Sequence, residues 1–258
     1  MSDVTVICCR TNEKMYGDFL NTLKSQNIPC EIIGIDNRGN NAFTSCAAAY
    51  NSVINQVDTE YVIFSHQDIL LTDANSLGNF LSYLQEIGHD DILGVAGTKF
   101  DSGGIYSGLT HKSRDGKLSP AGRNNVDGGI MECDTADECF FGGHTEHFRD
   151  YPFDAETCNG WHLYAAELCI RGKAQAVGKT YICAVPIMHL SYGNINLAFY
   201  RDFFRLCRKY SGKFPVIRTT CAFSRTDLFH LLPRFIYLCG GVILRKLGLY
   251  NLVKKLLR

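Results

Sequence analysis

Tyr61-Val-Ile-Phe-Ser-His66-Gln67-Asp68 is the stretch that decides the fold. Its first residues are apolar or aromatic and have strong β preference, which is typical of a strand buried in a parallel sheet. The three polar residues that follow then lie at the carboxyl end of this strand. Open α/β sheets bind their ligands at that edge. We therefore expect the strand to present metal-competent side chains to a ligand site.

The chain around this stretch alternates between strand and helix patterns. The first 70 residues read as strand 4–9, helix 13–26, strand 31–36, helix 43–56 and the strand just quoted. This order predicts an α/β fold with a mostly parallel central sheet, right-handed crossovers and flanking helices. A glycine-rich polar stretch at 98–129 interrupts the alternation, and a loop of this length inside a domain is more often functional than idle. The later elements are expected at 74–88 (helix), 92–97 and 130–141 (strands), 160–176 (helix), 180–187 (strand) and 197–210 (helix).

Composition excludes several classes of protein. The 258 residues are 46% hydrophobic and 20% charged, as in an ordinary globular protein, and the formal net charge of zero gives no basic field for nucleic acid. The N-terminus has no basic region followed by an apolar core, so we expect no secretory signal. The 12 cysteines form no CxxC pair, which disfavours a structural zinc site, and many lie inside apolar runs. These features favour a reducing cytosol.

Acidic residues follow two of the expected parallel strands. Asp36 ends the second strand and Asp68 follows the third, so both should reach one edge of the sheet. The first suits a nucleotide's ribose or base, and the second suits Mg²⁺ or Mn²⁺ bound to a diphosphate. His189, at the end of a later strand, could complete the metal site. The alternative is that both aspartates are turn and cap residues.

Two other groups of residues are candidates for acceptor chemistry. Asp137 and Glu138 adjoin apolar residues, and because neighbours on a strand point to opposite faces, at most one should face a site as a base. Trp161, His162 and Glu167 lie on the helix expected at 160–176. Trp161 stacks on a sugar in one interpretation and is a core aromatic in the other.

A set of short motifs occurs in a fixed order along the chain. They are Asp36-Asn37, Ala49-Tyr-Asn51, 62–68, Gly94-Val-Ala-Gly97, Asp137-Glu-Cys139, Phe153-Asp154, Gly160-Trp-His-Leu-Tyr164, Glu167-Leu168 and 186–191. In order and spacing this set resembles a bacterial family 2-like glycosyltransferase group with the GT-A fold, in which His-Gln-Asp replaces the usual Asp-X-Asp. The resemblance covers roughly residues 3–192. It implies that His66, Gln67 and Asp68 bind the metal and diphosphate and that His189 is a further metal ligand.

The resemblance also assigns roles to the substrates. It implies a nucleotide-sugar donor, most commonly a UDP-sugar, a glycan or lipid-linked glycan acceptor, and inversion at the anomeric carbon. Relatives carry an acidic base three residues before the Leu of an Asp-Leu pair, but this chain has Ala165 there. The base therefore stays open among Asp137, Glu138, His162 and Glu167. The residues expected to bind the donor are Asp36, Asn37, Asn51, His66, Gln67 and Trp161.

The C-terminal segment has a different composition. We expect a catalytic domain at 1–212 and a helical extension at 213–258, because no acidic residue follows Asp227 and six basic ones do. The apolar run at 235–244 is shorter than the roughly 20 residues that span a bilayer. Residues 249–258 predict an amphipathic basic helix suited to an anionic membrane surface, with a location peripheral to the inner membrane. The alternative is a helix docked on its own domain or on a partner.

Two other functions compete with glycosyl transfer. A nucleotidyltransferase should carry a glycine-rich phosphate loop after the first strand, but residues 9–12 are Cys-Arg-Thr-Asn. A membrane-associated glycan- or nucleotide-binding module without turnover would explain Ala165.

Overall fold

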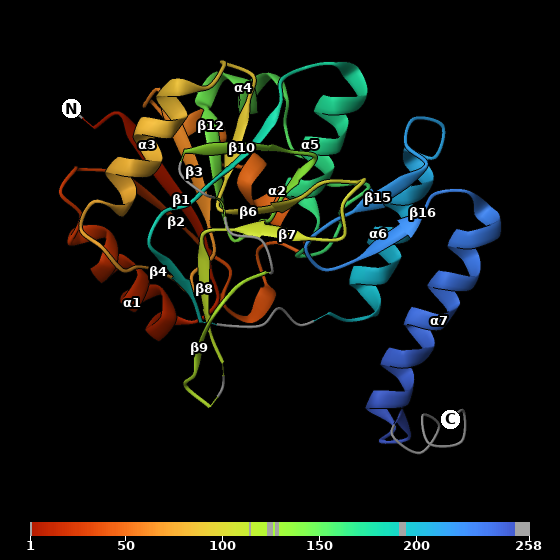
Figure 1. The fold of residues 1–258 in the computed structure, drawn as a ribbon. Helices are drawn as coiled ribbons and strands as arrows, with labels where there is room; N and C mark the ends of the chain where they lie inside the picture. Colours follow the sequence, from red (N-terminus) through yellow and green to blue (C-terminus); the bar gives the residue numbers. More distant parts are fainter. Residues whose placement is uncertain (1, 114, 123–125, 127–128, 191–194, 251–258) are drawn as a thin grey trace.

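The computed structural model describes all residues except 1, 114, 123–125, 127–128, 191–194 and 251–258. Its centre is a seven-stranded sheet in the order β10-β13-β5-β12-β3-β1-β2 (Figure 1). The strands of this sheet are β1 (Val4–Arg10), β2 (Glu31–Asp36), β3 (Tyr61–Ser65), β5 (Ile92–Gly94), β10 (Ile130–Cys133), β12 (Phe140–His144) and β13 (Thr180–Cys183).

Five of the seven strands run in one direction. β1 pairs in parallel with both β2 and β3, as the opening alternation predicts, and β13 pairs in parallel with β5. β12 is antiparallel to β3 and β5, and β10 is antiparallel to β13. The expected α/β fold with a mostly parallel sheet is therefore confirmed, with one antiparallel strand inserted in its middle.

Each face of the sheet has its own core, because successive strand residues point to opposite faces. On one face Val6 and Ile63 pack with helices α1 (Glu13–Lys24) and α3 (Ser76–Glu86). On the other, Ile7 and Phe64 pack with α2 (Cys46–Asn51), α5 (Tyr164–Gln175) and α6 (Leu197–Lys209). Figure 1 shows these two layers of helices on opposite sides of the sheet. The short helices η1 (Arg38–Asn40), η2 (Ile54–Gln56) and α4 (Thr145–Asp150) complete this part of the chain.

Three predicted strands are each divided between sheets. Residues 130–141 form β10 and the start of β12 in the central sheet, with β11 (Thr135–Ala136) in another sheet between them. Residues 92–97 form β5 and then β6 (Ala96–Thr98), which belongs to a second sheet of order β11-β6-β7. Residues 180–187 divide into β13, whose pairing in the central sheet ends at Cys183, and β14 (Ile187–His189), with Pro186 between them. β14 lies in a third sheet of order β4-β14-β8-β9. The remaining strands of these sheets are β4 (Ile69–Leu71), β7 (Ile105–Ser107), β8 (Leu109–Lys112) and β9 (Leu118–Pro120).

The helix expected at 160–176 begins later than predicted. α5 starts at Tyr164, and Leu163 before it has a φ of 71°, a left-handed conformation that is uncommon for a residue with a side chain. Trp161 and His162 therefore lie in the loop before α5 and not on the helix.

The C-terminal segment contains a hairpin and a long helix. The hairpin of β15 (Val216–Arg218) and β16 (Phe223–Arg225) is tied to the main body, since the hydroxyls of Thr98 and Thr135 donate to the Arg218 carbonyl oxygen at 3.0 and 3.2 Å. The division at residue 212 stays a prediction. α7 (Leu228–Lys246) follows at the edge of the molecule (Figure 1).

α7 extends the apolar run at 235–244 beyond the ten residues counted in the sequence. Its 19 residues are long and apolar enough to cross a membrane, so the expectation that this region is too short is wrong. Length and composition are the only grounds for this, and core helices and signal sequences meet the same criteria. The basic helix predicted at 249–258 lies almost entirely outside the described residues.

Candidate active site

A cavity of about 1020 Å³ opens at the carboxyl ends of the central strands. Its walls include Cys9 near the end of β1, Ser65 at the end of β3, and the turn residues Asp137 and Glu138. Gln67, Trp161 and His162 also line it. The edge of the sheet that the sequence predicts as the ligand site is thus the edge that carries the cavity.

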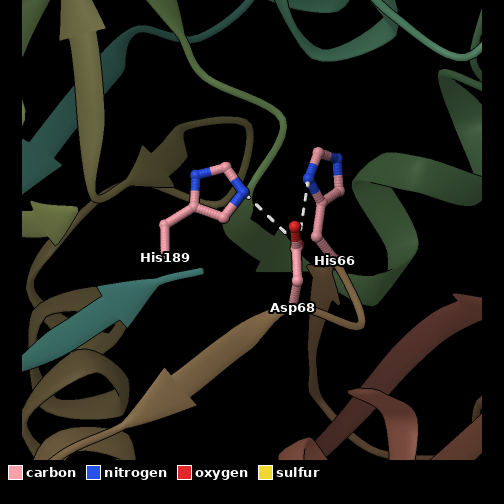
Figure 2. Close-up of side chains that lie close together, drawn as sticks. All are labelled: His66, Asp68 and His189. Atoms are coloured by element: carbon pink, nitrogen blue, oxygen red, sulfur yellow. Dashed lines mark ion pairs between the residues drawn. The ribbon is translucent and has the colours of Figure 1, made fainter. Parts of the chain in front are cut away.

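His66, Asp68 and His189 meet in this cavity (Figure 2). Asp68 Oδ1 lies 3.3 Å from His189 Nε2 and 3.9 Å from His66 Nδ1. The three ligand atoms all lie within 4.8 Å of one another, and Asp68 and His189 are buried. The structure therefore assembles two imidazoles and one carboxylate, drawn from positions more than 120 residues apart, into one cluster.

Strand pairing explains how the cluster forms. His66 follows β3, and its amide donates to the Cys139 carbonyl oxygen at 2.9 Å, which fixes the start of the turn. β14 pairs with β4 so that His189 lies opposite Ile69, and the Leu190 amide donates to the Asp68 carbonyl oxygen at 2.9 Å. This register places the last residue of β14 directly beside Asp68.

A hydrogen-bond chain orients the His66 ring. The Tyr164 hydroxyl donates to the Glu138 carbonyl oxygen and lies 3.3 Å from His66 Nε2. This contact orients the His66 ring so that Nδ1 faces Asp68. Burial lowers the pKa of His66, so the ring is kept in the neutral form that binds metals.

The electrostatics of His189 are different. Burial lowers its pKa, but the neighbouring Asp68 carboxylate outweighs this and the pKa of His189 is raised. The ring of His111, on β8, lies 5.3 Å from that of His189 and also lines the cavity. A cluster rich in imidazole therefore surrounds one buried carboxylate.

The cluster fits a divalent cation. Metal–ligand distances of about 2.1 Å place neighbouring ligand atoms about 3 Å apart. The separation between Asp68 and His189 is already close to this value, and a small rotation brings His66 closer. Three protein ligands also leave open positions for a substrate's phosphate oxygens.

Asp137 and Glu138 both line the cavity, so the expectation that at most one of them faces a site is wrong. They lie in the turn between β11 and β12 and not on a strand, so strand alternation does not apply. Asp137 accepts hydrogen bonds from the Thr220 hydroxyl and the Cys139 amide. Burial raises the pKa of Asp137, but the Thr220 bond and the charges of His189 and His66 outweigh it, and the pKa is lowered.

Glu138 is joined to the loop before α5. Its Oε1 accepts from the Leu163 amide at 3.2 Å and lies 3.2 Å from His162 Nδ1. A carboxylate here also compensates the start of α5, whose cap residue supplies no side-chain bond. The strained turn at Leu163 and the Glu138–His162 contact therefore form one unit at the cavity wall.

Glu167 does not take part in this site, which corrects its prediction as a candidate base. It is fully buried under α6. Its carboxylate accepts from Lys209 Nζ at 2.7 Å and from the Tyr210 hydroxyl at 2.6 Å. Its position in the first turn of α5 directs this acid toward α6 and away from the cavity.

Three predicted donor ligands have other partners. Asn37 is buried and its Oδ1 accepts from the Phe43 amide at 2.8 Å, while Asn51 makes two bonds with the backbone of Phe153. Both therefore brace loops and do not line the cavity. Asp36 stands exposed at the end of β2, outside the cavity wall, where bonds from Arg38 hold its pKa well below the usual range.

Gln67 lines the cavity but its amide group is engaged. Its Oε1 accepts from the amides of Thr11 and Asn12 at 2.9 and 2.8 Å, and its Nε2 donates to the Thr11 hydroxyl. The side chain therefore fastens the turn after β3 to the loop after β1.

Sequence reasoning missed Tyr164, His111 and Thr220 as residues of this site. Tyr164 belongs to a motif quoted above, and its place in that motif was the available signal. His111 lies in the glycine-rich stretch and Thr220 in a hairpin turn far along the chain, and neither has a sequence pattern that marks it.

A sheet of this topology, with a cation-competent cluster and an acid pair lining one cavity, is the arrangement of a glycosyltransferase of the GT-A class. Residues 5–189 match the family described as "Glycosyltransferase like family", and the chain belongs to this family. No curated protein matches the chain significantly.

Solved structures share the fold at low identity. TarS residues 1–349 of S. aureus with UDP-GlcNAc has a TM-score of 0.54 at 13% identity, over 80% of this chain and 66% of that one. The mannosyltransferase PcManGT from Pyrobaculum calidifontis, with GDP-Man and Mn²⁺, has 0.54 at 11%, over 82% and 65%. GalNAc-T7 with UDP, GalNAc and Mn²⁺ has 0.53 at 7%, over 93% and 55%. The chain thus spans about two thirds or less of their lengths, and these likenesses show the GT-A fold.

Proposed function

We propose that this protein is a metal-dependent glycosyltransferase that moves a sugar from a nucleotide-sugar to a glycan or lipid-linked glycan. The observation that carries the proposal is the His66, Asp68 and His189 cluster, which lines one cavity together with Asp137 and Glu138 in a member of a glycosyltransferase family. UDP-sugars are the first donors to test, since TarS was solved with UDP-GlcNAc. A role in bacterial surface polysaccharide or glycolipid synthesis, at the inner face of a membrane, stays a prediction.

The metal cluster binds the donor's diphosphate in this proposal. Two imidazoles beside one carboxylate favour Mn²⁺ over Mg²⁺, because Mg²⁺ prefers an all-oxygen shell. Two of the similar structures contain Mn²⁺. A bound cation supplies Lewis-acid stabilisation of the departing nucleoside diphosphate. Tyr164 orients the His66 ring so that Nδ1 is turned toward that position.

Glu138 and His162 act on the acceptor. When His162 Nδ1 donates to Glu138, the other ring nitrogen becomes an acceptor for a hydroxyl proton, and Glu138 stabilises the resulting imidazolium. Asp137 is less suited to this step, since both its oxygens accept hydrogen bonds and its pKa is lowered. Attack by the activated hydroxyl opposite the leaving group inverts the anomeric centre.

Transfer from UDP- and GDP-sugars with Mn²⁺ tests the proposal. We expect Glu138→Gln and His162→Ala to lower kcat by about 10² or more, the usual size of acid–base catalysis. The fold is monitored by thermal unfolding. Transfer at the wild-type rate in both variants would contradict the assignment of the base.

A binding module without turnover is the second candidate. The observation that favours it is Ala165, which is fully buried at the start of α5 where relatives carry an acid. Calorimetric binding of donor with Mn²⁺, in the absence of transfer or hydrolysis of any donor, would favour this candidate over the transferase.

A further inference from the structure

α7 carries apolar side chains on two opposite faces. The inner face packs on the body of the protein, where Leu231 and Val242 are buried and the Phe235 ring lies 4.8 Å from that of Phe204 on α6. These contacts lie near both ends of the helix. α7 is therefore held lengthwise against the domain.

The outer face is an uninterrupted apolar stripe. At 100° per residue, seven positions of α7 and its C-terminal end fall within an arc of about 100°, and none of them is polar. With a rise of 1.5 Å per residue the stripe is about 27 Å long. Its large side chains are 47 to 85% exposed. The seven residues are Phe229, Leu232, Pro233, Ile236, Gly240, Ile243 and Leu247.

The charged side chains of α7 itself all have one sign. No acidic residue follows Asp227 in the sequence, whereas Arg234, Arg245 and Lys246 lie on α7 itself and three more basic residues follow. Arg245 and Lys246 are exposed at its C-terminal end. Tyr237 beside the stripe is 69% exposed, and its ring has the amphipathic character found at membrane interfaces.

We propose that the outer face of α7 docks on an anionic lipid bilayer, with the helix lying in the plane of the interface. An exposed apolar stripe of this length marks an interaction surface, and its uncompensated positive charge complements anionic headgroups. A second copy of the segment offers no acidic side chain to these cations. A membrane-spanning position would remove the inner face from α6 and bury Arg234 in lipid.

The segment that directly precedes α7 in the sequence reaches the cavity wall. The β15–β16 hairpin leads directly into α7, and the Thr220 hydroxyl in its turn donates to Asp137 at the cavity wall. Docking thus gives a lipid-linked acceptor, held in the same bilayer, a short path to the site. This last step rests on the proposed function, whereas the docking does not.

Vesicle co-sedimentation of the full chain tests the docking without reference to turnover. We expect the wild type to bind vesicles containing phosphatidylglycerol at least about tenfold more tightly than phosphatidylcholine vesicles. The double variant Phe229→Ser/Ile236→Ser should lose at least about tenfold in binding, because each substitution removes a large apolar side chain that the wild type buries in the bilayer. Leu118→Ser, at a residue 58% exposed on β9, is the matched control and should bind like the wild type. Unchanged thermal unfolding shows that the variants fold.

Three outcomes would overturn the docking. The first is that the wild type ignores anionic vesicles. The second is that it resists extraction from them by alkaline carbonate, as a spanning helix does. The third is a dimer in lipid-free solution that the double variant abolishes while vesicle binding is absent. Transfer to a soluble acceptor together with failed vesicle binding would refute the docking and leave the proposed function intact.

Discussion

Glu167→Gln should destabilise the protein without affecting its chemistry. The carboxylate is fully buried and accepts from Lys209 and Tyr210, and Arg171 Nε lies 3.6 Å from its second oxygen. Replacing the Glu167 carboxylate by a neutral amide leaves the Lys209 ammonium and the Arg171 guanidinium each with one anionic partner fewer. Removing one member of a buried ion pair costs about 3–5 kcal/mol. Because Lys209 keeps Asp154 as a second partner, we expect about 2–3 kcal/mol.

The assay for this variant is thermal and chemical unfolding together with metal and donor binding. For a chain of this size, about 2–3 kcal/mol corresponds to a fall in Tm of about 4–12 °C. Mn²⁺ affinity and kcat of the folded fraction should stay at the wild-type level. Glu156→Gln, at an exposed acid before α5, is the matched control and should leave Tm unchanged. A variant with normal Tm but no turnover would refute this reasoning and return Glu167 to the catalytic candidates.

Three further predictions concern the site and its supports. His189→Ala should weaken Mn²⁺ binding by about 10- to 100-fold in equilibrium titration, with little change in fold. Thr220→Val removes a hydrogen bond to the Asp137 carboxylate, so the pKa of Asp137 should rise, at a stability cost of about 1–2 kcal/mol in urea unfolding. Burial raises the pKa of Asp154, but Lys209 and Thr157 outweigh it and the pKa is lowered. Its contribution to stability is therefore present above about pH 4 and lost as pH falls further. Urea midpoints should drop below pH 4, and less so in Asp154→Asn.

Local sequence patterns were sufficient to predict the first half of the fold. Strands 4–9, 31–36 and 61–65 consist of β-branched and aromatic residues between loops, and each forms as expected. The three divided strands were not predictable, because each change of sheet depends on which distant strand pairs with each part. The antiparallel insertion of β12 has the same cause, since its partners β3 and β5 are far away in sequence.

The candidate site was predictable only at strand ends. His66, Asp68 and His189 follow strands whose carboxyl ends meet, so their position in the fold follows from the strand pattern. Side-chain direction within loops and helices was not predictable in this way. Asn37 and Asn51 turn to backbone partners, Glu167 turns under α6, and the acids at 137 and 138 lie in a turn that reads as strand.

The central claim is that Asp68 holds a divalent cation for the donor. The most direct test is binding of Mn²⁺, followed by electron paramagnetic resonance, to the wild type and to Asp68→Asn, with exposed Asp58→Asn as control. We expect one tight Mn²⁺ site in the wild type and in Asp58→Asn, with UDP altering its spectrum. Asp68→Asn should lose at least about tenfold in affinity. Equal Mn²⁺ affinity in Asp68→Asn and the wild type would contradict the account.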